Sequence, residues 1–319
     1  MTRRFSFRQH PVLGTELHVI VVGQAGDSAQ QAHHRVLGEI SRLESLLSTY
    51  RDDSALAHWM HGAVDDEHVP KEVVDVLAVA QEWFAASRGA LNPDLGRLRA
   101  RWRQAERDGR APSRDECAGL AAQSAALPYW VEVDAGGRRV RRLRDCSGLD
   151  LDAVAKGWIV DRAAEAAIGA GVESAMVNCG GDLRIVGSGS VRVAIEDPRS
   201  VLDNADPLAV AEVGSGGLAS SGGARRGFAV AGEWFGHVLD PRSGWPVDAT
   251  AGATVIAADT ATADALATVV GVEGLSGPTA SALLAVTESA ALVVDGDGGV
   301  RASPLWADRT AAAVGRSTD

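Results

Sequence analysis

The stretch that decides the fold is MVNCGGDLRIVG, Met176 to Gly187, in which two short β-prone runs flank a pair of glycines. Short apolar runs with Gly-rich breaks are typical of strands joined by tight turns. The same character returns in VRVAIEDP, FAVAGEWFGHVLDP and ATVIAAD further along the chain. This pattern predicts one extended, largely antiparallel sheet in the C-terminal part of the chain.

Helical segments are expected before and between these strands. Apolar residues recur at helical spacing in Ala29–Tyr50 and Glu72–Arg88, and Gly89 follows as a C-cap would. The Arg-rich stretch Arg97–Arg114 predicts a solvated helical surface, with anion binding as its alternative. We predict an α+β fold, with a largely antiparallel sheet flanked by helices in one two-lobed domain over residues 1–319. The other predicted elements are a strand at Thr15–Val22 and helices at Lys156–Ala170, Thr260–Val270 and Pro278–Val286.

Composition excludes several classes of partner. The chain has a net charge of −11, which argues against nucleic acid or an anionic membrane as the main partner. No apolar run reaches the length of a membrane span, and the N-terminal residues carry charge without an apolar leader. Cys117, Cys146 and Cys179 fit no CxxC pattern, so we expect reduced, buried thiols. We therefore expect a cytoplasmic protein that binds neither nucleic acid nor membrane.

Familiar catalytic motifs are missing from the sequence. It contains neither GxxxxGK[ST] nor a GxGxxG after a predicted strand, so neither a P-loop nor a Rossmann fingerprint is indicated. GxSxG and HExxH are also absent. The candidate chemistry must therefore come from polar residues set among apolar ones.

One such group is TADALAT, residues 262–268, which places Asp264 and Thr268 one helical turn apart. Their two oxygens can reach a common object. Magnesium prefers hard oxygen ligands and often shares its coordination with substrate phosphates, so the pair suits such an ion. The alternative is that Asp264 caps a helix or faces water.

A second group is LDLDAVAKGW, residues 149–158. Asp150 and Asp152 alternate as on a strand, and Lys156 then opens the predicted helix. A helix N-terminus with a lysine suits a phosphate, because free N–H groups and a positive charge meet there. A surface lysine beside an N-capping aspartate is the alternative.

Three further segments carry polar residues between predicted elements. In NCGGDL, Asp182 either orients a ligand or belongs to a plain hairpin turn. In LASSGGARR, residues 218–226, serines and glycines can cradle phosphate through backbone N–H groups. In HVLDPRSGWP, residues 237–246, His237 is either a general base or a satisfied core histidine.

Taken in order, these motifs resemble those of the FAD:protein FMN transferase family, the ApbE-type flavin transferases. The resemblance covers almost the whole chain, and it rests on the order of the motifs rather than on any one of them. It also includes VLGTELHV near Leu13, STYRDDS at Ser48–Ser54 and GALNPDLGRL at Gly89–Leu98.

The resemblance implies a bilobed α+β fold that binds FAD in a cleft, with Mg²⁺ on the pyrophosphate. Asp264 and Thr268 resemble the side-chain ligands of the metal, and Ala153 resembles its backbone-carbonyl ligand. Tyr50 resembles the aromatic residue that stacks on the isoalloxazine. The other positions that match cofactor-binding residues of the family are Leu13, Ala90, Leu91, Asn92, Asp150, Lys156 and Val238.

The reaction that the resemblance implies is transfer of FMN from FAD to a Thr or Ser hydroxyl of a partner protein, with release of AMP. Mg²⁺ and Lys156 would neutralise charge on the phosphates, and Asp264 would act in catalysis by holding the metal. His237 is the candidate for deprotonating or orienting the acceptor hydroxyl. Two alternatives stay open at this point: Mg²⁺-dependent hydrolysis of FAD to FMN and AMP, and a flavin carrier without catalysis.

The sequence also departs from the family pattern. Leu13 stands for the usual Met, and Asn92 stands for the usual Asp. The segment SSGGARR lacks the usual Asp-Tyr, which makes the adenine or acceptor side of the cleft the least secure part. DATAGAT, residues 248–254, resembles the Ser/Thr-Gly-Ala-Thr acceptor motif, but Ala251 stands at the acceptor position. We read that segment as the start of a strand, and no self-flavinylation is expected there.

Overall fold

The structure is a computed structural model that describes residues 2–62, 66–134, 137–200, 205–223 and 225–309. Its centre is an eight-stranded sheet in the order β1-β2-β5-β6-β9-β12-β13-β14, and neighbouring strands pair antiparallel throughout. The predicted α+β fold with a large antiparallel sheet is confirmed. The strands of this sheet are β1 (Arg3–Val12), β2 (Thr15–Gly23), β5 (Ser174–Cys179), β6 (Asp182–Gly187), β9 (Gly216–Gly222), β12 (Thr250–Ala257), β13 (Ala290–Asp295) and β14 (Val300–Ala302).

The β-prone runs on either side of the Gly-Gly pair form neighbouring strands, β5 and β6. Cys179 pairs with Asp182 across the turn. Gly180 and Gly181 have φ of +62° and +96°, a region that side chains disfavour, so the turn requires glycine. The turn brings Asp182 back into the sheet as the first residue of β6, a strand that packs against helix α6.

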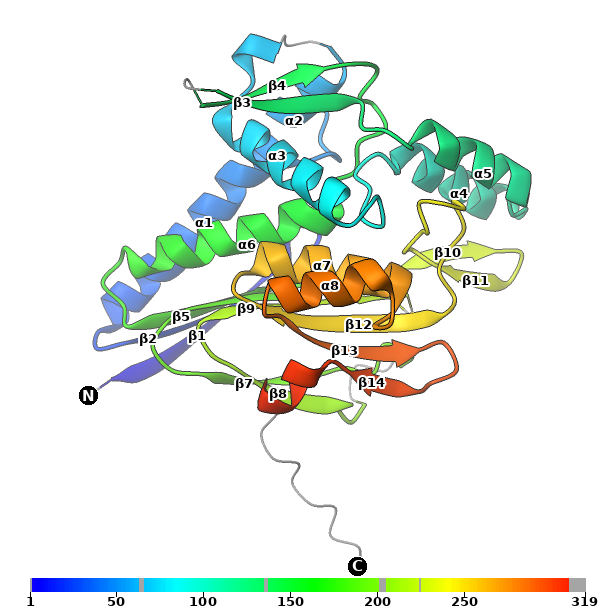
Figure 1. The fold of residues 1–319 in the computed structure, drawn as a ribbon. Coiled ribbons are helices and arrows are strands. Elements are labelled where there is room, and N and C mark those ends of the chain that lie inside the picture. The colour runs from blue at the N-terminus through cyan, green and yellow to red at the C-terminus, as the bar shows by residue number, and fades with distance from the viewer. Residues whose placement is uncertain (1, 63–65, 135–136, 201–204, 224, 310–319) are drawn as a thin grey trace, which may run out of the picture.

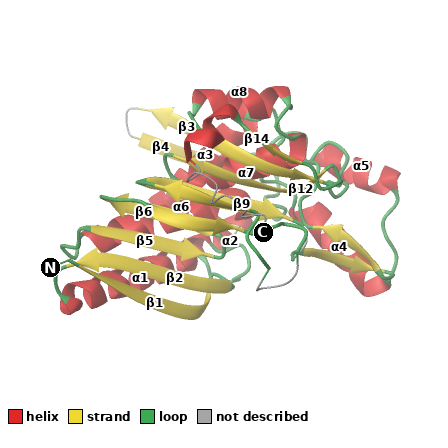
Figure 2. Ribbon diagram, turned by 90° about the horizontal axis from the view of Figure 1, so that it is seen from below, coloured by secondary structure: helices red, strands yellow, loops and turns green. Residues whose placement is uncertain are grey.

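Helices cover one face of the sheet, and α6 and α7 lie side by side above its centre (Figures 1 and 2). Their apolar faces and that side of the sheet form the main hydrophobic core. The helices are α1 (Gly26–Leu47), α2 (Ala55–Met60), α3 (Lys71–Ala86), α4 (Gly96–Asp108), α5 (Arg114–Gln123), α6 (Asp152–Ile168), α7 (Thr260–Glu273) and α8 (Pro278–Val286), with short 3₁₀ turns at Asp66–His68 and Pro304–Arg309.

Three two-stranded sheets extend the molecule beyond this layer. The β7–β8 pair (Val191–Ile195, Ala209–Val213) shares a second apolar cluster with the other face of the main sheet. The β3–β4 pair (Tyr129–Asp134, Gly137–Arg142) lies with α2 and α3 (Figure 1). The β10–β11 pair (Gly227–Val230, Glu233–Gly236) packs on α4 around Trp102 in a third cluster. The single two-lobed domain over the whole chain stays a prediction.

Several predicted helix ends are wrong. Helix α1 ends at Leu47, so Tyr50 lies in the following loop. Helix α3 ends at Ala86, and its C-cap is Ser87 rather than Gly89. Gly89 lies two residues further on, where its N–H donates to Phe84 O at 2.8 Å. The stretch Arg97–Arg114 is split between α4 and α5, because Gly109 adopts φ +63° and closes the first of them.

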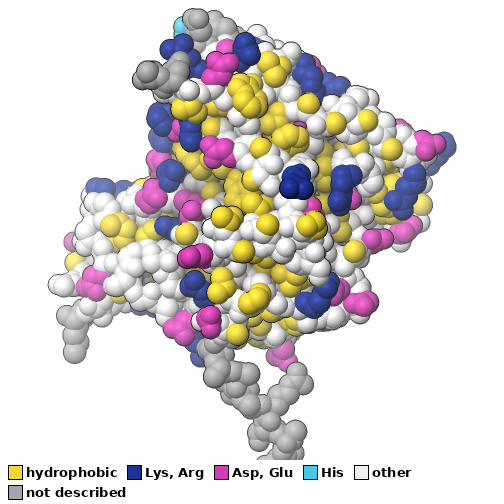
Figure 3. Space-filling view, viewed as in Figure 1, with side chains coloured by type: hydrophobic (Ala, Val, Ile, Leu, Met, Phe, Trp, Pro, Cys, Tyr) yellow, Lys and Arg dark blue, Asp and Glu magenta, His cyan; other side chains and the backbone are white. Residues whose placement is uncertain are grey.

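Charges of both signs are interspersed over the face of the molecule that Figure 3 shows. Among the helices of the described residues, none is both long and apolar enough to cross a membrane. The three cysteines are buried and free.

A buried carboxylate joins α6 to α7. Asp161 accepts hydrogen bonds from Thr260 N at 2.8 Å and Ala261 N at 2.9 Å, two amides at the start of α7. These amides have no partner within their own helix, because the first turn of any helix leaves its N–H groups free. Asp161 therefore fixes the start of α7, the helix that carries Asp264.

We expect Asp161→Ala to lower the free energy of unfolding by about 3 kcal/mol, because it leaves two buried N–H groups unpaired. Chemical denaturation followed by circular dichroism measures this change. Asp259→Ala is the matched control: its side chain caps the same helix through Thr262 N at 2.7 Å, and its loss is expected to cost about 1 kcal/mol. Equal effects of the two variants would contradict a special role for Asp161.

Candidate active site

A large cavity of about 1480 Å³ lies where α1, α4, α6 and α7 meet β9 and the β10–β11 pair. It is larger than the 300–1,000 Å³ that is typical of a small-molecule site. Every residue predicted from the sequence to bind cofactor or metal, or to act in catalysis, lines this cavity. They are Leu13, Tyr50, Ala90, Leu91, Asn92, Asp150, Ala153, Lys156, His237, Val238, Asp264 and Thr268. Their individual roles stay predictions.

Helix α6 begins earlier than predicted. It starts at Asp152, so Lys156 lies one turn inside the helix rather than at its first residue, and residues 149–151 form no strand. The reason is local: Asp150 Oδ1 accepts a hydrogen bond from Asp152 N at 3.1 Å and turns the chain into the helix. Ala153, the predicted carbonyl ligand, therefore lies in the first turn of α6.

Helices α6 and α7 approach closely at Gly157. A Cβ atom there would lie 2.6 Å from Thr260 O, so only glycine permits this contact. The amide of Gly157 donates to Asp264 Oδ2 at 3.2 Å. In a regular helix that amide pairs with the Ala153 carbonyl, so Asp264 competes with this carbonyl for the proton. Asp264 and Ala153 thus face the same end of the cavity.

Asp264 is buried in the second turn of α7, with 9% of its surface exposed. It therefore neither caps a helix nor faces water; the cap of α7 is Asp259. Burial, together with the nearby Asp182, raises the pKa of Asp264 well above its usual range. A cation at this carboxylate would relieve that cost.

The donor set fits a magnesium ion only in part. Asp264 offers a carboxylate, Thr268 a hydroxyl one turn further along α7, and Ala153 a carbonyl. Among the described residues, no group of three or more His, Cys, Asp or Glu side chains is close enough to hold a metal alone. These oxygens are hard ligands, and the coordination would be completed by ligand phosphates and water.

Lys156 lies beside this group and is paired with a residue that the sequence left ambiguous. Its Nζ is 2.8 Å from Asp182 Oδ2, and Asp182 has only 1% of its side chain exposed. The pKa of Lys156 is raised because the carboxylates of Asp182 and Asp264 outweigh burial, so the ammonium stays charged. The hairpin-turn alternative for Asp182 does not explain why its side chain is buried.

Tyr50 is tied to α6 through a carboxylate. Its Oη donates to Asp152 Oδ2 at 2.5 Å. Tyr50 is 64% exposed and lines the cavity. Arg99 of α4 contacts Asp150 Oδ2 at 2.8 Å and Asp152 Oδ2 at 3.1 Å. Burial and the Asp152 carboxylate raise the pKa of Tyr50 to about 12, so its hydroxyl stays protonated.

Sequence reasoning missed Arg99 and gave Asp152 no role in the site. The alternation of Asp150 and Asp152 was visible, but it was interpreted as strand spacing. Arg99 lies in an Arg-rich stretch where nothing local distinguishes one arginine from the next. Only the fold shows that this arginine, with 22% of its side chain exposed, reaches the cavity.

His237 lies at the end of the β10–β11 pair and is neutral. Its Nδ1 is 3.2 Å from Arg226 O. Burial, with the charges of Arg99 and Arg226, lowers the pKa of His237 to about 4. Since a carbonyl can only accept, the neutral ring keeps its proton on Nδ1 and leaves Nε2 as a base. The core-histidine alternative explains the bond to Arg226 but not the position of His237 on the cavity wall.

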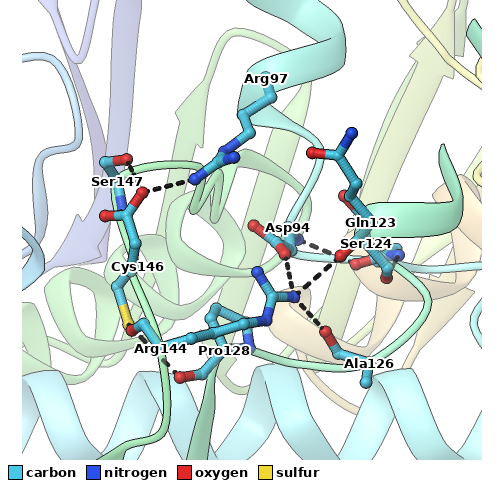
Figure 4. A network of polar contacts seen from close by, with 11 residues as sticks. Asp94, Arg97, Gln123, Ser124, Ala126, Pro128, Arg144, Cys146 and Ser147 are labelled. Atoms are coloured by element: carbon cyan, nitrogen blue, oxygen red, sulfur yellow. Dashed lines mark hydrogen bonds and ion pairs between the residues drawn. The ribbon is translucent and has the colours of Figure 1, made fainter. Parts of the chain in front are cut away.

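The loop over residues 90–95 is held by a polar network behind the cavity wall (Figure 4). Arg144 Nη2 donates to buried Asp94 Oδ2 at 2.8 Å and to Gln123 O at 3.1 Å. The side chain of Asn92 donates to Ser124 O at 2.8 Å. The side-chain amide of Asn92 therefore ties this loop to the end of α5.

The LASSGGARR segment forms β9 and the loop after it. Ser220 Oγ is 2.8 Å from Thr254 Oγ1 of β12, and Ser220, Ser221 and Arg226 line the cavity. Ala224, one of the two departures from the usual Asp-Tyr, lies outside the described residues.

Comparison with known proteins identifies the family. The model of the ApbE family matches residues 13–291, most of the chain, and the chain therefore belongs to the ApbE family. It is 28% identical over 270 residues to a Vibrio cholerae serotype O1 protein named FAD:protein FMN transferase, covering 81% of this chain and 78% of that protein. A Haemophilus influenzae protein of the same name is 28% identical over 273 residues, covering 80% and 77%.

Solved structures agree with the fold. The crystal structure of the ApbE protein from Thermotoga maritima superposes with a TM-score of 0.80 at 25% identity, covering 97% of this chain and all of that one (100%). The apo form of the Pseudomonas stutzeri flavinyl transferase ApbE gives a TM-score of 0.76 at 27% identity, with 98% of both chains covered. The resemblance found from the motifs is confirmed.

Proposed function

We propose that this protein transfers FMN from FAD to a Thr or Ser hydroxyl of a partner protein in a Mg²⁺-dependent reaction that releases AMP. The observation that carries the proposal is the convergence of Lys156, Asp264, Thr268 and His237 on one cavity. These residues come from two helices and a distant loop, and together they supply phosphate-neutralising and proton-accepting groups. The relatives named FAD:protein FMN transferase support the same activity.

The flavin ring would lie against Tyr50. The hydroxyl of Tyr50 is held by Asp152, so the residue offers the face of its ring to a planar ligand. Ala90, Leu91 and Val238 add apolar and backbone surface nearby. Asp150, which is predicted to contact the flavin nucleotide, is held by Arg99.

Asp264, Thr268 and the Ala153 carbonyl would hold Mg²⁺ together with the pyrophosphate. When bound, the ion would offset the negative charge that develops on the transferring phosphoryl group. Lys156 adds a second positive charge on the same wall of the cavity. Transfer of this kind depends mainly on positioning and charge neutralisation rather than on covalent chemistry by the protein.

In the proposed reaction, the acceptor oxygen bonds to the phosphorus of the FMN half. The bond from that phosphorus to the bridging pyrophosphate oxygen breaks, and AMP leaves. The proton of the acceptor hydroxyl goes to His237 Nε2, which is unprotonated because the histidine is neutral. The acceptor is proposed to be a cytoplasmic protein with a Ser/Thr-Gly-Ala-Thr-like motif.

The test is to follow AMP and FMN by liquid chromatography after incubation with FAD and Mg²⁺, with and without a domain that carries such a motif. Transfer predicts AMP release that depends on the acceptor and on Mg²⁺, with little free FMN. Equal amounts of AMP and free FMN without acceptor would instead show the hydrolase. Bound FAD with no AMP in either case would show a carrier.

Tyr50→Phe is expected to raise the KM for FAD about fivefold, because the ring loses a hydrogen bond of about 1 kcal/mol that holds its orientation. Tyr50→Ala is expected to raise it more, since the stacking surface is lost as well. Steady-state kinetics at saturating acceptor measures both values. Trp234→Phe is the control for a general loss of aromatic surface at the same cavity. An unchanged KM in both Tyr50 variants would place the flavin ring elsewhere.

A further inference from the structure

Asp182 is a buried carboxylate that the proposed mechanism leaves without a role. Its side chain is almost fully enclosed, and apart from the ammonium of Lys156 its oxygens have no partner among the described residues. A buried charge with so few partners is costly to desolvate, and an apolar pair of similar volume is often as stable. The pair is therefore better explained by the site than by the stability of the fold.

Two carboxylates, those of Asp182 and Asp264, interact electrostatically with the Lys156 ammonium. Asp182 and Asp264 are both buried, and both raise the pKa of the lysine. The structure pairs Lys156 with Asp182 at 2.8 Å and brings Asp264 to the amide of Gly157 instead. Opposite charges attract strongly in such surroundings, so without Asp182 the ammonium would turn to Asp264.

The charges of the three groups then decide what Asp264 can bind. When all three groups are ionised, two carboxylates and one ammonium sum to one negative charge, which is left on the carboxylate of Asp264, one helical turn from the Thr268 hydroxyl. If Asp182 were neutral, Lys156 and Asp264 would cancel, and a divalent cation would have to displace the ammonium from its ligand.

We propose that Asp182 is a positioning residue that holds Lys156 away from Asp264, so that Asp264 remains open to a divalent cation and Lys156 faces the phosphates. This inference rests on the proposed function, since it assigns the roles of Lys156 and Asp264 in phosphate chemistry. The position of Asp182 supports it: Asp182 opens β6 directly after the Gly-Gly turn, under the second turn of α6. The sheet thus presents this carboxylate to Lys156, which lines the cavity as Asp182 itself does not.

The test measures Mn²⁺ binding by the loss of the free-ion EPR signal, with ADP present as a pyrophosphate that carries no FMN to transfer. Asp182→Asn is expected to weaken Mn²⁺ binding about tenfold, because Lys156 then competes for Asp264. The double variant Asp182→Asn/Lys156→Gln restores the single negative charge and is expected to bind Mn²⁺ within about twofold of the parent protein. Lys156→Gln alone is expected to bind it more tightly.

A merely structural role for Asp182 predicts a different ranking of Mn²⁺ affinities among the variants. If Asp182 only supported the fold, the double variant would bind Mn²⁺ at least as weakly as Asp182→Asn, and this result would overturn the inference. Asp182→Asn with unchanged Mn²⁺ binding would overturn it as well. Thermal unfolding of each variant shows whether it is folded, and the conservative double variant keeps the test decisive if Asp182→Asn alone unfolds.

Kinetics separate this inference from the proposed function. Asp182→Asn is expected to lower kcat for FMN transfer about 100-fold with a KM for FAD within about threefold of the parent, because the ammonium acts mainly on the transition state. If the parent protein transfers no FMN while the Mn²⁺ order holds, the proposed function fails and the positioning role stands. If FMN transfer occurs while the parent protein and all variants bind Mn²⁺ with equal affinity, only the positioning role fails.

Discussion

Asp264→Ala is expected to lower the rate of FMN transfer by at least about 10³-fold, because a metal at the transferring phosphoryl group contributes several kcal/mol. The fold should persist. Asp264 is a buried carboxyl close to Asp182, and both burial and that neighbour raise its pKa, so its removal relieves the cost of ionising it there. AMP release from FAD in the presence of acceptor measures the rate, and chemical denaturation measures the stability.

Thr262→Ala is the matched control for Asp264→Ala, since it lies on the same helix but does not line the cavity. It is expected to leave turnover within about twofold of the parent, as a surface substitution away from the site should. Unchanged turnover in Asp264→Ala would refute the metal assignment. A loss of stability by several kcal/mol would show that the residue is structural instead.

His237→Gln is expected to lower kcat for FMN transfer by about 10²- to 10⁴-fold, the range for loss of a general base. Glutamine can still donate to the Arg226 carbonyl, so the loop should keep its position. FAD binding, measured by quenching of flavin fluorescence, should change little. A variant that loses FAD binding and rate together would point to a binding role for His237.

The pH dependence gives an independent test of His237. A base acts in its unprotonated form, and the pKa of His237 is lowered to about 4 by burial and two arginines. The acid limb of kcat/KM is therefore expected near pH 4 rather than near the 6.5 of a free histidine. A limb near pH 6.5 that disappears in His237→Gln would show a solvated, ordinary histidine.

The sheet and most helices were predictable because their signals are local. Alternating β-prone runs around Gly180 and Gly181 mark β5 and β6, and the helix predicted at Pro278–Val286 has the observed bounds. Helix ends were less predictable. Asp150 starts α6 through a side-chain bond that sequence spacing does not reveal, and this moved Lys156 one turn into the helix.

The predicted site residues all line one cavity. They could be predicted together because the order of the motifs indicated a family whose site residues they match. The residues that support them were not predictable, since each contact joins distant parts of the chain. Asp182 meets Lys156 only because β6 runs under α6, and Arg99 meets Asp150 only because α4 folds back on the start of α6. Burial, which distinguishes these charges from ordinary surface ones, is a property of the fold.

The most direct test is the intact mass of the acceptor after incubation with this protein, FAD and Mg²⁺. Transfer predicts a gain equal to one FMN on a domain with a Ser/Thr-Gly-Ala-Thr motif, with one AMP released for each modified molecule. The gain should disappear when the acceptor hydroxyl is replaced by alanine and when Asp264→Ala replaces the parent enzyme. An unmodified acceptor alongside stoichiometric free FMN and AMP would contradict the transferase and establish a hydrolase.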